Sequence, residues 1–150
     1  MHTVQEILAR KGPQFNYIDA EAFVRDAITL LKSENISYLI VSKDGKYMGL
    51  FSERDYTHKV ILMNRHSDTT TVKEVLTRDL PIVTGSDSAE HCMRLMNSYK
   101  TRYLPVFDEY EFKGVITIHD MMRESLAEHE DDIKNKFGED TSNTERNYWI

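Results

Sequence analysis

The sequence predicts an α/β protein of the α+β kind, built from two tandem copies of one small unit. Two observations predict this fold class. The phrase TVQEILARK at residues 3–11 returns as TVKEVLTRD at residues 71–79. The segments after each phrase then alternate strand-like and helical patterns in the same order. Each copy therefore reads as strand, helix, strand, strand and helix, with the repeated phrase as a short helix in front.

The repetition continues well beyond the opening phrase. The first copy carries three extra residues before its first strand, and from there the copies align without a gap at an offset of 65. Identical pairs include Tyr38 with Tyr103 and Asp55 with Asp120. Chance would rarely align identities and the apolar rhythm together. The chain therefore contains a duplicated structural unit with approximate two-fold symmetry.

The elements of the first copy follow from local patterns. Residues 37–42 are β-branched and apolar, as in a buried strand, and residues 47–52 form the returning strand. Asp-Gly at residues 44–45 supplies the positive φ angles of a tight hairpin. Apolar stripes with helical spacing predict two helices: residues 20–34, through Phe23, Ala27, Leu30 and Leu31, and residues 53–64, through Tyr56, Val60 and Met63.

The same patterns divide the chain. We expect the first repeat at residues 1–66, the second at 67–128 and a C-terminal extension at 129–150. One copy of about 60 residues buries too little surface alone, so the copies should pack sheet to sheet and create two equivalent clefts for small ligands. In the extension, the helical rhythm continues to about residue 137, and the remaining polar tail is typical of disorder.

Composition excludes several classes of protein. The net charge of −6 argues against a general binder of nucleic acid or anionic membranes. The single cysteine, Cys92, fits a reducing compartment and a small buried side chain. The sequence has no secretory signal, no apolar run of the roughly 20 residues that a spanning helix needs, no metal-ligand spacing and no catalytic motif. We expect a cytoplasmic protein that is not an enzyme and has no metal site.

The stretch GLFSERD repeats as GVITIHD, and this motif could bind a ligand. Its glycine permits close approach of a ligand or of neighbouring backbone. Its hydroxyl residue, Ser52 or Thr117, stands where a helix begins, a position that favours phosphate. Its aspartate, Asp55 or Asp120, can accept two hydrogen bonds from a vicinal diol such as ribose. The alternative is simple helix capping, but the same pattern in both copies favours a ligand site.

With these motifs the sequence resembles a CBS-domain pair, also called a Bateman module, over roughly residues 1–128. The stretches SERDYTHKV and TRYLPV and the two lead-in phrases carry the resemblance together with the doubled motif. It implies a regulatory module that binds an adenosine compound and pairs as a homodimer. AMP is the first candidate ligand, and ADP, ATP, NAD and S-adenosylmethionine are the others. It also implies that Asp55 and Asp120 hold the ribose, that Ser52 and Thr117 approach the phosphate, and that adenine lies between strands.

Positive side chains near the motifs differ between the copies. Arg54 and Arg102 are phosphate candidates because a guanidinium matches phosphate geometry, although both could be solvated surface residues. His119 takes the place of Arg54 in the second copy, so we predict unequal affinities. Tyr38 and Tyr103 either line the adenine pocket or belong to the core. Further candidates for nucleotide binding are Ile18, Val83, Leu104 and Pro105.

The leading hypothesis is a sensor whose clefts bind a nucleotide and whose altered packing is read by an unidentified protein partner. The rival hypothesis is a structural dimerisation module without bound nucleotide. Both predict the same fold. They differ in whether the doubled motif binds an adenosine compound.

Overall fold

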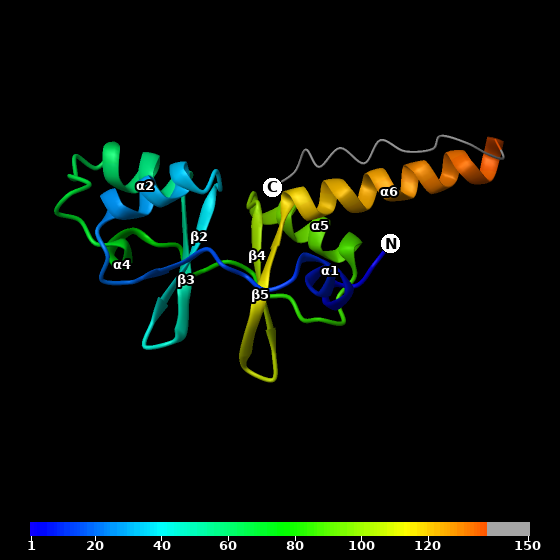
Figure 1. The fold of residues 1–150 in the computed structure, drawn as a ribbon, viewed down its shortest axis with the longest axis horizontal. Coiled ribbons are helices and arrows are strands. Elements are labelled where there is room, and N and C mark those ends of the chain that lie inside the picture. The colour runs from blue at the N-terminus through cyan, green and yellow to red at the C-terminus, as the bar shows by residue number, and fades with distance from the viewer. Residues whose placement is uncertain (138–150) are drawn as a thin grey trace. The chain divides into compact units, whose positions relative to one another are not determined.

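The computed structural model describes residues 1–137, which form two compact units. The Asp55 unit contains residues 14–79, and the Asp120 unit contains residues 1–13 and 80–137. One unit has a three-stranded sheet and the other a two-stranded sheet, each with helices (Figure 1). The predicted α/β class with two repeats is confirmed.

The Asp55 unit holds the sheet β1-β2-β3, in which β1 is parallel to β2 and β3 is antiparallel to it. The hairpin between β2 and β3 turns through Asp44 and Gly45, both with positive φ, as Asp-Gly predicted. The elements of this unit are β1 (Tyr17–Asp19), α2 (Val24–Ser33), β2 (Tyr38–Lys43), β3 (Lys46–Ser52), α3 (Glu53–Asp55), the π-helix η1 (Tyr56–Ile61) and α4 (Val72–Val75).

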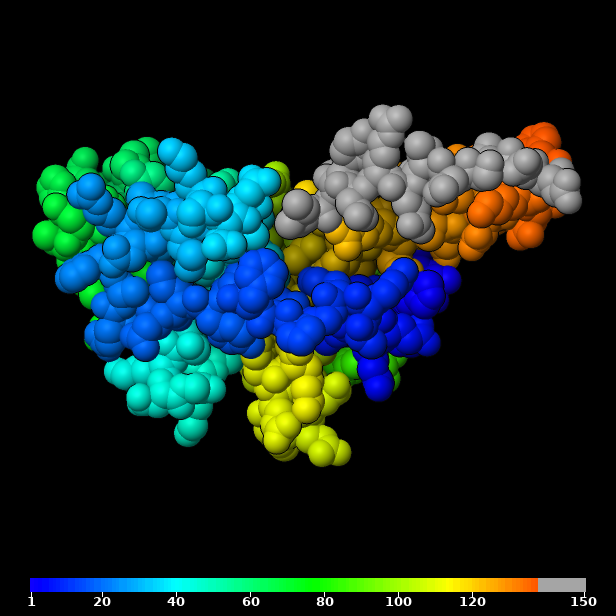
Figure 2. Space-filling view, in the orientation of Figure 1, coloured from blue at the N-terminus to red at the C-terminus, as the bar shows by residue number. Residues whose placement is uncertain are grey.

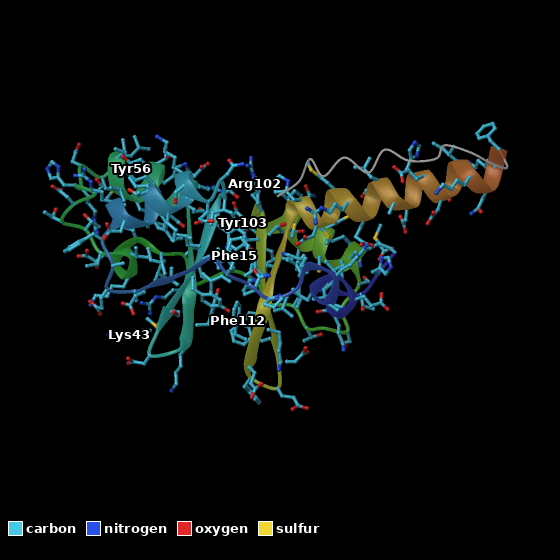
Figure 3. The ribbon with its side chains drawn as sticks, in the orientation of Figure 1. Phe15, Lys43, Tyr56, Arg102, Tyr103 and Phe112 are labelled. Atoms are coloured by element: carbon cyan, nitrogen blue, oxygen red, sulfur yellow. The ribbon has the colours of Figure 1, made fainter. Side chains whose placement is uncertain are left out.

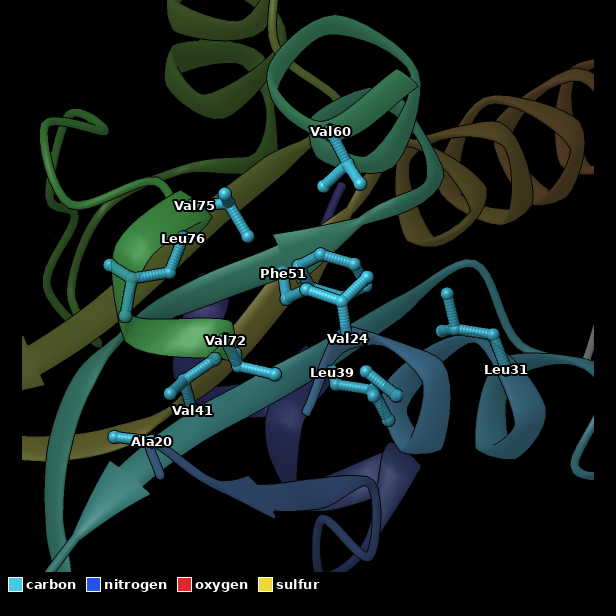
Figure 4. Packing of buried hydrophobic residues seen from close by; sticks show 11 residues of the cluster. Ala20, Val24, Leu31, Leu39, Val41, Phe51, Val60, Val72, Val75 and Leu76 are labelled. Carbon is cyan, nitrogen blue, oxygen red and sulfur yellow. The ribbon is translucent and has the colours of Figure 1, made fainter. Parts of the chain in front are cut away.

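Helix α2 and the lead-in helix α4 cover the sheet of the Asp55 unit and form its core with it (Figure 4). The predicted stripe of α2 is wrong at Phe23, which is 45% exposed. Phe23 is the N-cap and has extended backbone, so the helix begins one residue later and Val24 faces inward. The buried core residues are Ala20, Val24, Ala27, Leu31, Leu39, Val41, Phe51, Val60, Val72, Val75 and Leu76.

The helix predicted at residues 53–64 differs from an ordinary α-helix. It turns from α3 into η1, where the backbone N–H of Leu62 donates to the Thr57 carbonyl five residues earlier. This wider turn keeps Val60 in the core, but η1 ends at Ile61 and Met63 is 64% exposed. The prediction that Met63 belongs to the apolar face is therefore wrong. Single π-turns occur often at functional sites.

The Asp120 unit repeats this plan with one weaker strand. Its equivalent of β1 is reduced to a single bridge between Val83 and Val106. In the Asp55 unit the N–H of Ile40 donates to the carbonyl of Asn16, the residue immediately before β1. The residue equivalent to Ile40 in the Asp120 unit is Pro105, which has no N–H. The elements are α1 (Val4–Lys11), α5 (Ala89–Tyr99), β4 (Tyr103–Asp108), β5 (Glu111–Thr117) and α6 (Ile118–Phe137).

The two lead-in helices are exchanged relative to the order of the repeats. Helix α1 precedes the first repeat, yet Val4 and Ile7 are buried in the core of the Asp120 unit. Helix α4 precedes the second repeat, yet Val72 and Val75 are buried in the core of the Asp55 unit. In the space-filling view the N-terminal residues, in dark blue, lie against other residues of the Asp120 unit (Figure 2). Each unit is therefore completed by a helix from the other repeat's sequence.

Helix α6 reaches residue 137, as the helical rhythm predicted. The predicted disordered tail and the final Tyr-Trp-Ile lie outside the described residues. Cys92 is fully buried in α5, and burial raises the pKa of its thiol to about 11, with a smaller contribution from Asp87. Its role is that of a small apolar side chain.

Candidate functional site

The first motif lies where β3 turns into α3, and its aspartate is held by four donors. The Asp55 side chain is 6% exposed. Its Oδ2 accepts from the backbone N–H of Ser52 at 2.9 Å and from the Ser52 hydroxyl at 3.2 Å, which forms a capping box. Its Oδ1 accepts from the Thr77 hydroxyl at 2.6 Å and pairs with Lys59 Nζ at 2.9 Å. This carboxylate is buried among polar partners.

The second motif has the same backbone geometry where β5 turns into α6. Asp120 Oδ2 accepts from the N–H of Thr117 at 2.8 Å and from its hydroxyl at 3.2 Å. The same oxygen accepts from Lys11 Nζ at 2.9 Å, and this ammonium also donates to the Val115 carbonyl. The Asp120 side chain is 4% exposed. Both turns therefore place a carboxylate, a hydroxyl group and an ammonium together.

The glycine of the motif serves backbone packing in the Asp55 unit. Gly49 has a φ of 157°, and a Cβ there would lie 2.5 Å from the Thr77 carbonyl oxygen. The neighbouring Leu50 exchanges two backbone hydrogen bonds with Thr77, of 3.0 and 2.8 Å. Of the two roles proposed for this glycine, close approach of backbone is the one observed here. Thr77 is fixed beside Asp55 as a result.

Strand register brings the predicted tyrosines to the motifs. Tyr38 is paired with Ser52 across β2 and β3, and Tyr103 is paired with Thr117 across β4 and β5. The Tyr38 hydroxyl donates to the Gln14 side chain at 3.1 Å. Both tyrosines are half-buried, and each lies on the strand next to the one that ends in the motif.

The remaining candidates occupy strands or turns of their own units. Arg54 lies within α3 and is exposed, and His119 lies at the equivalent place in α6 and is half-buried. Arg102 is exposed immediately before β4, where Figure 3 labels it next to Tyr103. Ile18 in β1 is half-buried, and Val83, Leu104 and Pro105 are buried. The predicted clefts between the copies, and binding by these residues, stay predictions.

Three polar residues at the motifs were not predicted from the sequence. Lys59 follows Asp55 by four residues on the same helical face, a spacing that could have indicated an ion pair. Thr77 and Lys11 reach the aspartates from the exchanged lead-in segments. No local pattern could have found these two residues, because their contacts depend on the tertiary packing of α1 and α4.

A further polar cluster lies next to the second motif. Glu124, at the position equivalent to Lys59, is 2% exposed. It accepts from the backbone N–H of His2 at 3.0 Å, contacts the His2 ring at 2.9 Å and is bonded to Arg10. Burial acts to raise the pKa of Glu124, but these hydrogen bonds outweigh it and hold the pKa below the ordinary 4.5. Within residues 1–137, no acidic, histidine or cysteine group is arranged to hold a metal ion.

Comparison with known proteins decides the family. The model of the CBS domain matches residues 4–61 and again residues 72–127. The chain belongs to the CBS-domain family. A CBS pair is a regulatory module, and this chain holds both members of such a pair. Within residues 1–137, no helix is long and apolar enough to cross a membrane.

Sequence similarity to known relatives covers most of the length of this CBS pair. The CBS domain-containing protein CBSX3, mitochondrial, of Arabidopsis thaliana is 26% identical over 141 residues, which are 88% of this chain and 68% of that protein. A homoserine O-acetyltransferase of Methanosarcina acetivorans is 28% identical over 105 residues, but these residues make up only 18% of that enzyme.

Solved structures with the same fold include CBS-domain proteins, one of them in complex with adenosine compounds. A protein with CBS domains from Burkholderia ambifaria MC40-6 has a TM-score of 0.78 and 32% identity, and the match covers 94% of this chain and 99% of that one. The CBS domain pair of protein MJ0100, in complex with 5′-methylthioadenosine and S-adenosyl-L-methionine, has a TM-score of 0.72 and 22% identity, covering 85% and 98%. The latter likeness shows the fold alone.

Proposed function

We propose that this CBS pair is a regulatory sensor that binds an adenosine nucleotide at its two motifs. One observation carries the proposal: both strand-to-helix turns hold a buried carboxylate against a hydroxyl group in nearly the same geometry. The distance from the backbone N–H to the carboxylate is 2.9 Å at Ser52 and 2.8 Å at Thr117. The burial of these carboxylates, whose side chains are 6% and 4% exposed, distinguishes the two turns from the exposed capping boxes at Thr3 and Thr71.

Each motif offers the groups that an adenosine nucleotide needs. Asp55 and Asp120 would accept the ribose hydroxyls, and the nearby serine and threonine hydroxyls would approach the phosphate. Lysine ammonium groups lie 2.9 Å from both aspartates, so positive charge for a phosphate is at hand in a chain of net charge −6. The remaining contacts would come from Ile18, Tyr38, Arg54, Val83, Arg102, Tyr103, Leu104, Pro105 and His119.

AMP is the first candidate ligand, followed by ADP, ATP, NAD and S-adenosylmethionine. The complex of the MJ0100 pair with two adenosine compounds supports this chemical class. The chain would act without catalysis: ligand would favour one arrangement of the repeats, or of a homodimer, and a protein partner would respond to it. We place this protein in the cytoplasm, where a buried, unpaired thiol such as that of Cys92 stays reduced.

Mass spectrometry of the denatured protein, purified without added nucleotide, tests the proposal first. The expected result is a co-purified adenosine compound, or a rise in melting temperature when AMP, ATP, NAD or S-adenosylmethionine is added. Guanosine monophosphate is the matched control ligand, since it has the same ribose and phosphate but another base. Absence of any adenosine compound, together with an unchanged melting temperature, would contradict the proposal.

A structural dimerisation module is the second candidate function, and an apolar stripe on α6 favours it. Leu126, Ile133 and Phe137 are 50%, 40% and 78% exposed, and their spacing puts them near one side of the helix. Helix α6 continues past α5, and the side chains of residues 128–137 are all exposed (Figure 1). Such a stripe suits association with a second copy.

Sedimentation velocity tests the self-association on which this second function depends. The wild-type chain is expected to form a dimer, and Leu126→Glu with Ile133→Glu is expected to yield monomers with unchanged helical content. Glu130→Gln, at an exposed position of the same helix, is the control. A wild-type monomer at high micromolar concentration would contradict self-association through α6.

A further inference from the structure

The two aspartates of the motifs differ in how many hydrogen bonds they can still accept. An ionised carboxylate has about four acceptor positions, two on each oxygen. At Asp55 four donor groups fill them: the Ser52 N–H and hydroxyl at Oδ2, and Thr77 and Lys59 at Oδ1. At Asp120 three donors all reach Oδ2, and no donor within residues 1–137 reaches Oδ1.

Access to solvent does not explain this difference, because the side chains are 6% exposed for Asp55 and 4% for Asp120. The difference lies in the partners. Because no protein donor in the described part of the chain occupies Asp120 Oδ1, the hydroxyl groups of a ligand can bond to this oxygen without displacing a protein group. At Asp55, the same hydroxyl groups must first displace Thr77 or Lys59.

Thr77 is the harder of these two residues to displace. Its backbone is bonded to Leu50 in both directions, and its carbonyl oxygen occupies the space left by the missing side chain of Gly49. Lys59 is 41% exposed at the end of a flexible side chain, so it can turn toward a phosphate. The hydroxyl of Thr77 also accepts from Lys59 at 3.0 Å and thereby links it to Asp55.

We propose that Thr77 sets the order in which the two motifs fill, by closing Asp55 Oδ1 and leaving the Asp120 motif as the tighter site for a ribose diol. This inference rests on the proposed function. It adds a direction to the unequal affinities expected from the sequence and assigns their cause to one hydroxyl group. That group comes from the exchanged lead-in segment that follows α4.

Calorimetric titration with AMP of single and double variants tests this proposal. Asp120→Asn is expected to remove the tighter site, and Asp55→Asn is expected to leave it within about twofold. Adding Thr77→Val to Asp120→Asn is expected to tighten the remaining site by about tenfold, because a competing hydrogen bond to a charged group is removed. Thr77→Ser keeps the hydroxyl and is expected to change nothing.

Thr29→Val is the control, since Thr29 is exposed on α2 and its hydroxyl donates to the Arg25 carbonyl, away from both motifs. Thermal melts establish that each variant folds, and Thr77→Ala replaces Thr77→Val if the latter unfolds. Two results would overturn this inference and leave the proposed function intact. The first is AMP binding whose affinity falls more in Asp55→Asn than in Asp120→Asn. The second is an affinity for AMP that does not increase when the Thr77 hydroxyl is removed. Failure of every variant and of the wild type to bind any adenosine ligand would instead remove the proposed function and this inference with it.

Discussion

Each aspartate of the motifs performs a structural task within its own unit. Its carboxylate closes a capping box with Ser52 or Thr117 at the start of a helix. Loss of such a cap costs about 1 kcal/mol. A substitution of Asp55 or Asp120 is therefore expected to lower stability as well as the proposed binding, and an asparagine, which keeps the shape and one acceptor oxygen, separates the two effects better than alanine.

Glu124 gives a prediction for stability against pH. Its pKa is held below 4.5 in the folded chain by the bonds from His2 and Arg10 that outweigh burial. A carboxyl group with a lowered folded pKa contributes stability above its unfolded pKa, and this contribution is lost as the pH falls through the folded pKa. Glu124→Gln is expected to lower the free energy of unfolding by about 1–3 kcal/mol at pH 7 and by progressively less below pH 4.5.

Urea unfolding of the wild type and of Glu124→Gln between pH 7 and pH 3 measures this effect. Glu130→Gln, an exposed substitution with the same change of charge on the same helix, serves as the control. A gap between wild type and Glu124→Gln that stays constant down to pH 3 would show that the Glu124 charge does not stabilise the fold.

At the scale of elements, the exchange of the lead-in helices links each unit to a distant part of the sequence. Ile7 of α1 is 3% exposed in the Asp120 unit, and Val75 of α4 is 1% exposed in the Asp55 unit. Ile7→Ala is expected to cost about 2–5 kcal/mol and to speed amide exchange in α5, β4 and β5. Val75→Ala, which removes fewer methyl groups, is expected to cost less and to speed exchange in α2, β2 and β3.

Hydrogen exchange read by mass spectrometry resolves these segments. Ala9→Gly, at an exposed position of α1, weakens that helix without removing a core side chain. It is expected to speed amide exchange in the same segments as Ile7→Ala, but by a smaller factor. Faster exchange of residues 14–79 in Ile7→Ala, with residues 80–137 unchanged, would contradict the exchanged packing.

Several elements were predictable because their signals are local. Asp-Gly predicted the first hairpin, and apolar spacing predicted α2 and the full length of α6. The errors arose where a tertiary contact or a single missing group determines the local structure. The π-turn of η1 exposes Met63, and the absent N–H of Pro105 reduces a strand to one bridge. Phe23 could be read as part of a helical stripe, but the helix begins after it.

At the scale of the whole molecule, duplication supplies two motifs in a chain of net charge −6. The fixed spacing at which Ser52, Asp55, Thr117 and Asp120 recur was sufficient to predict their place where a strand turns into a helix. It was not sufficient to predict the partners of the aspartates, because Lys11 and Thr77 arrive from segments 109 and 22 residues away. Positive charge next to the motif carboxylates is therefore a property of the fold and not of the net composition.

At both motifs, the proposed role of the carboxylate is to bind an adenosine compound. Calorimetric titration of AMP into the wild type and into the double variant Asp55→Asn with Asp120→Asn tests it most directly. We expect saturable heat with the wild type and no measurable binding to a double variant that still melts cooperatively. Equal binding of AMP to both proteins, or no heat with the wild type for AMP, ATP, NAD or S-adenosylmethionine, would contradict it.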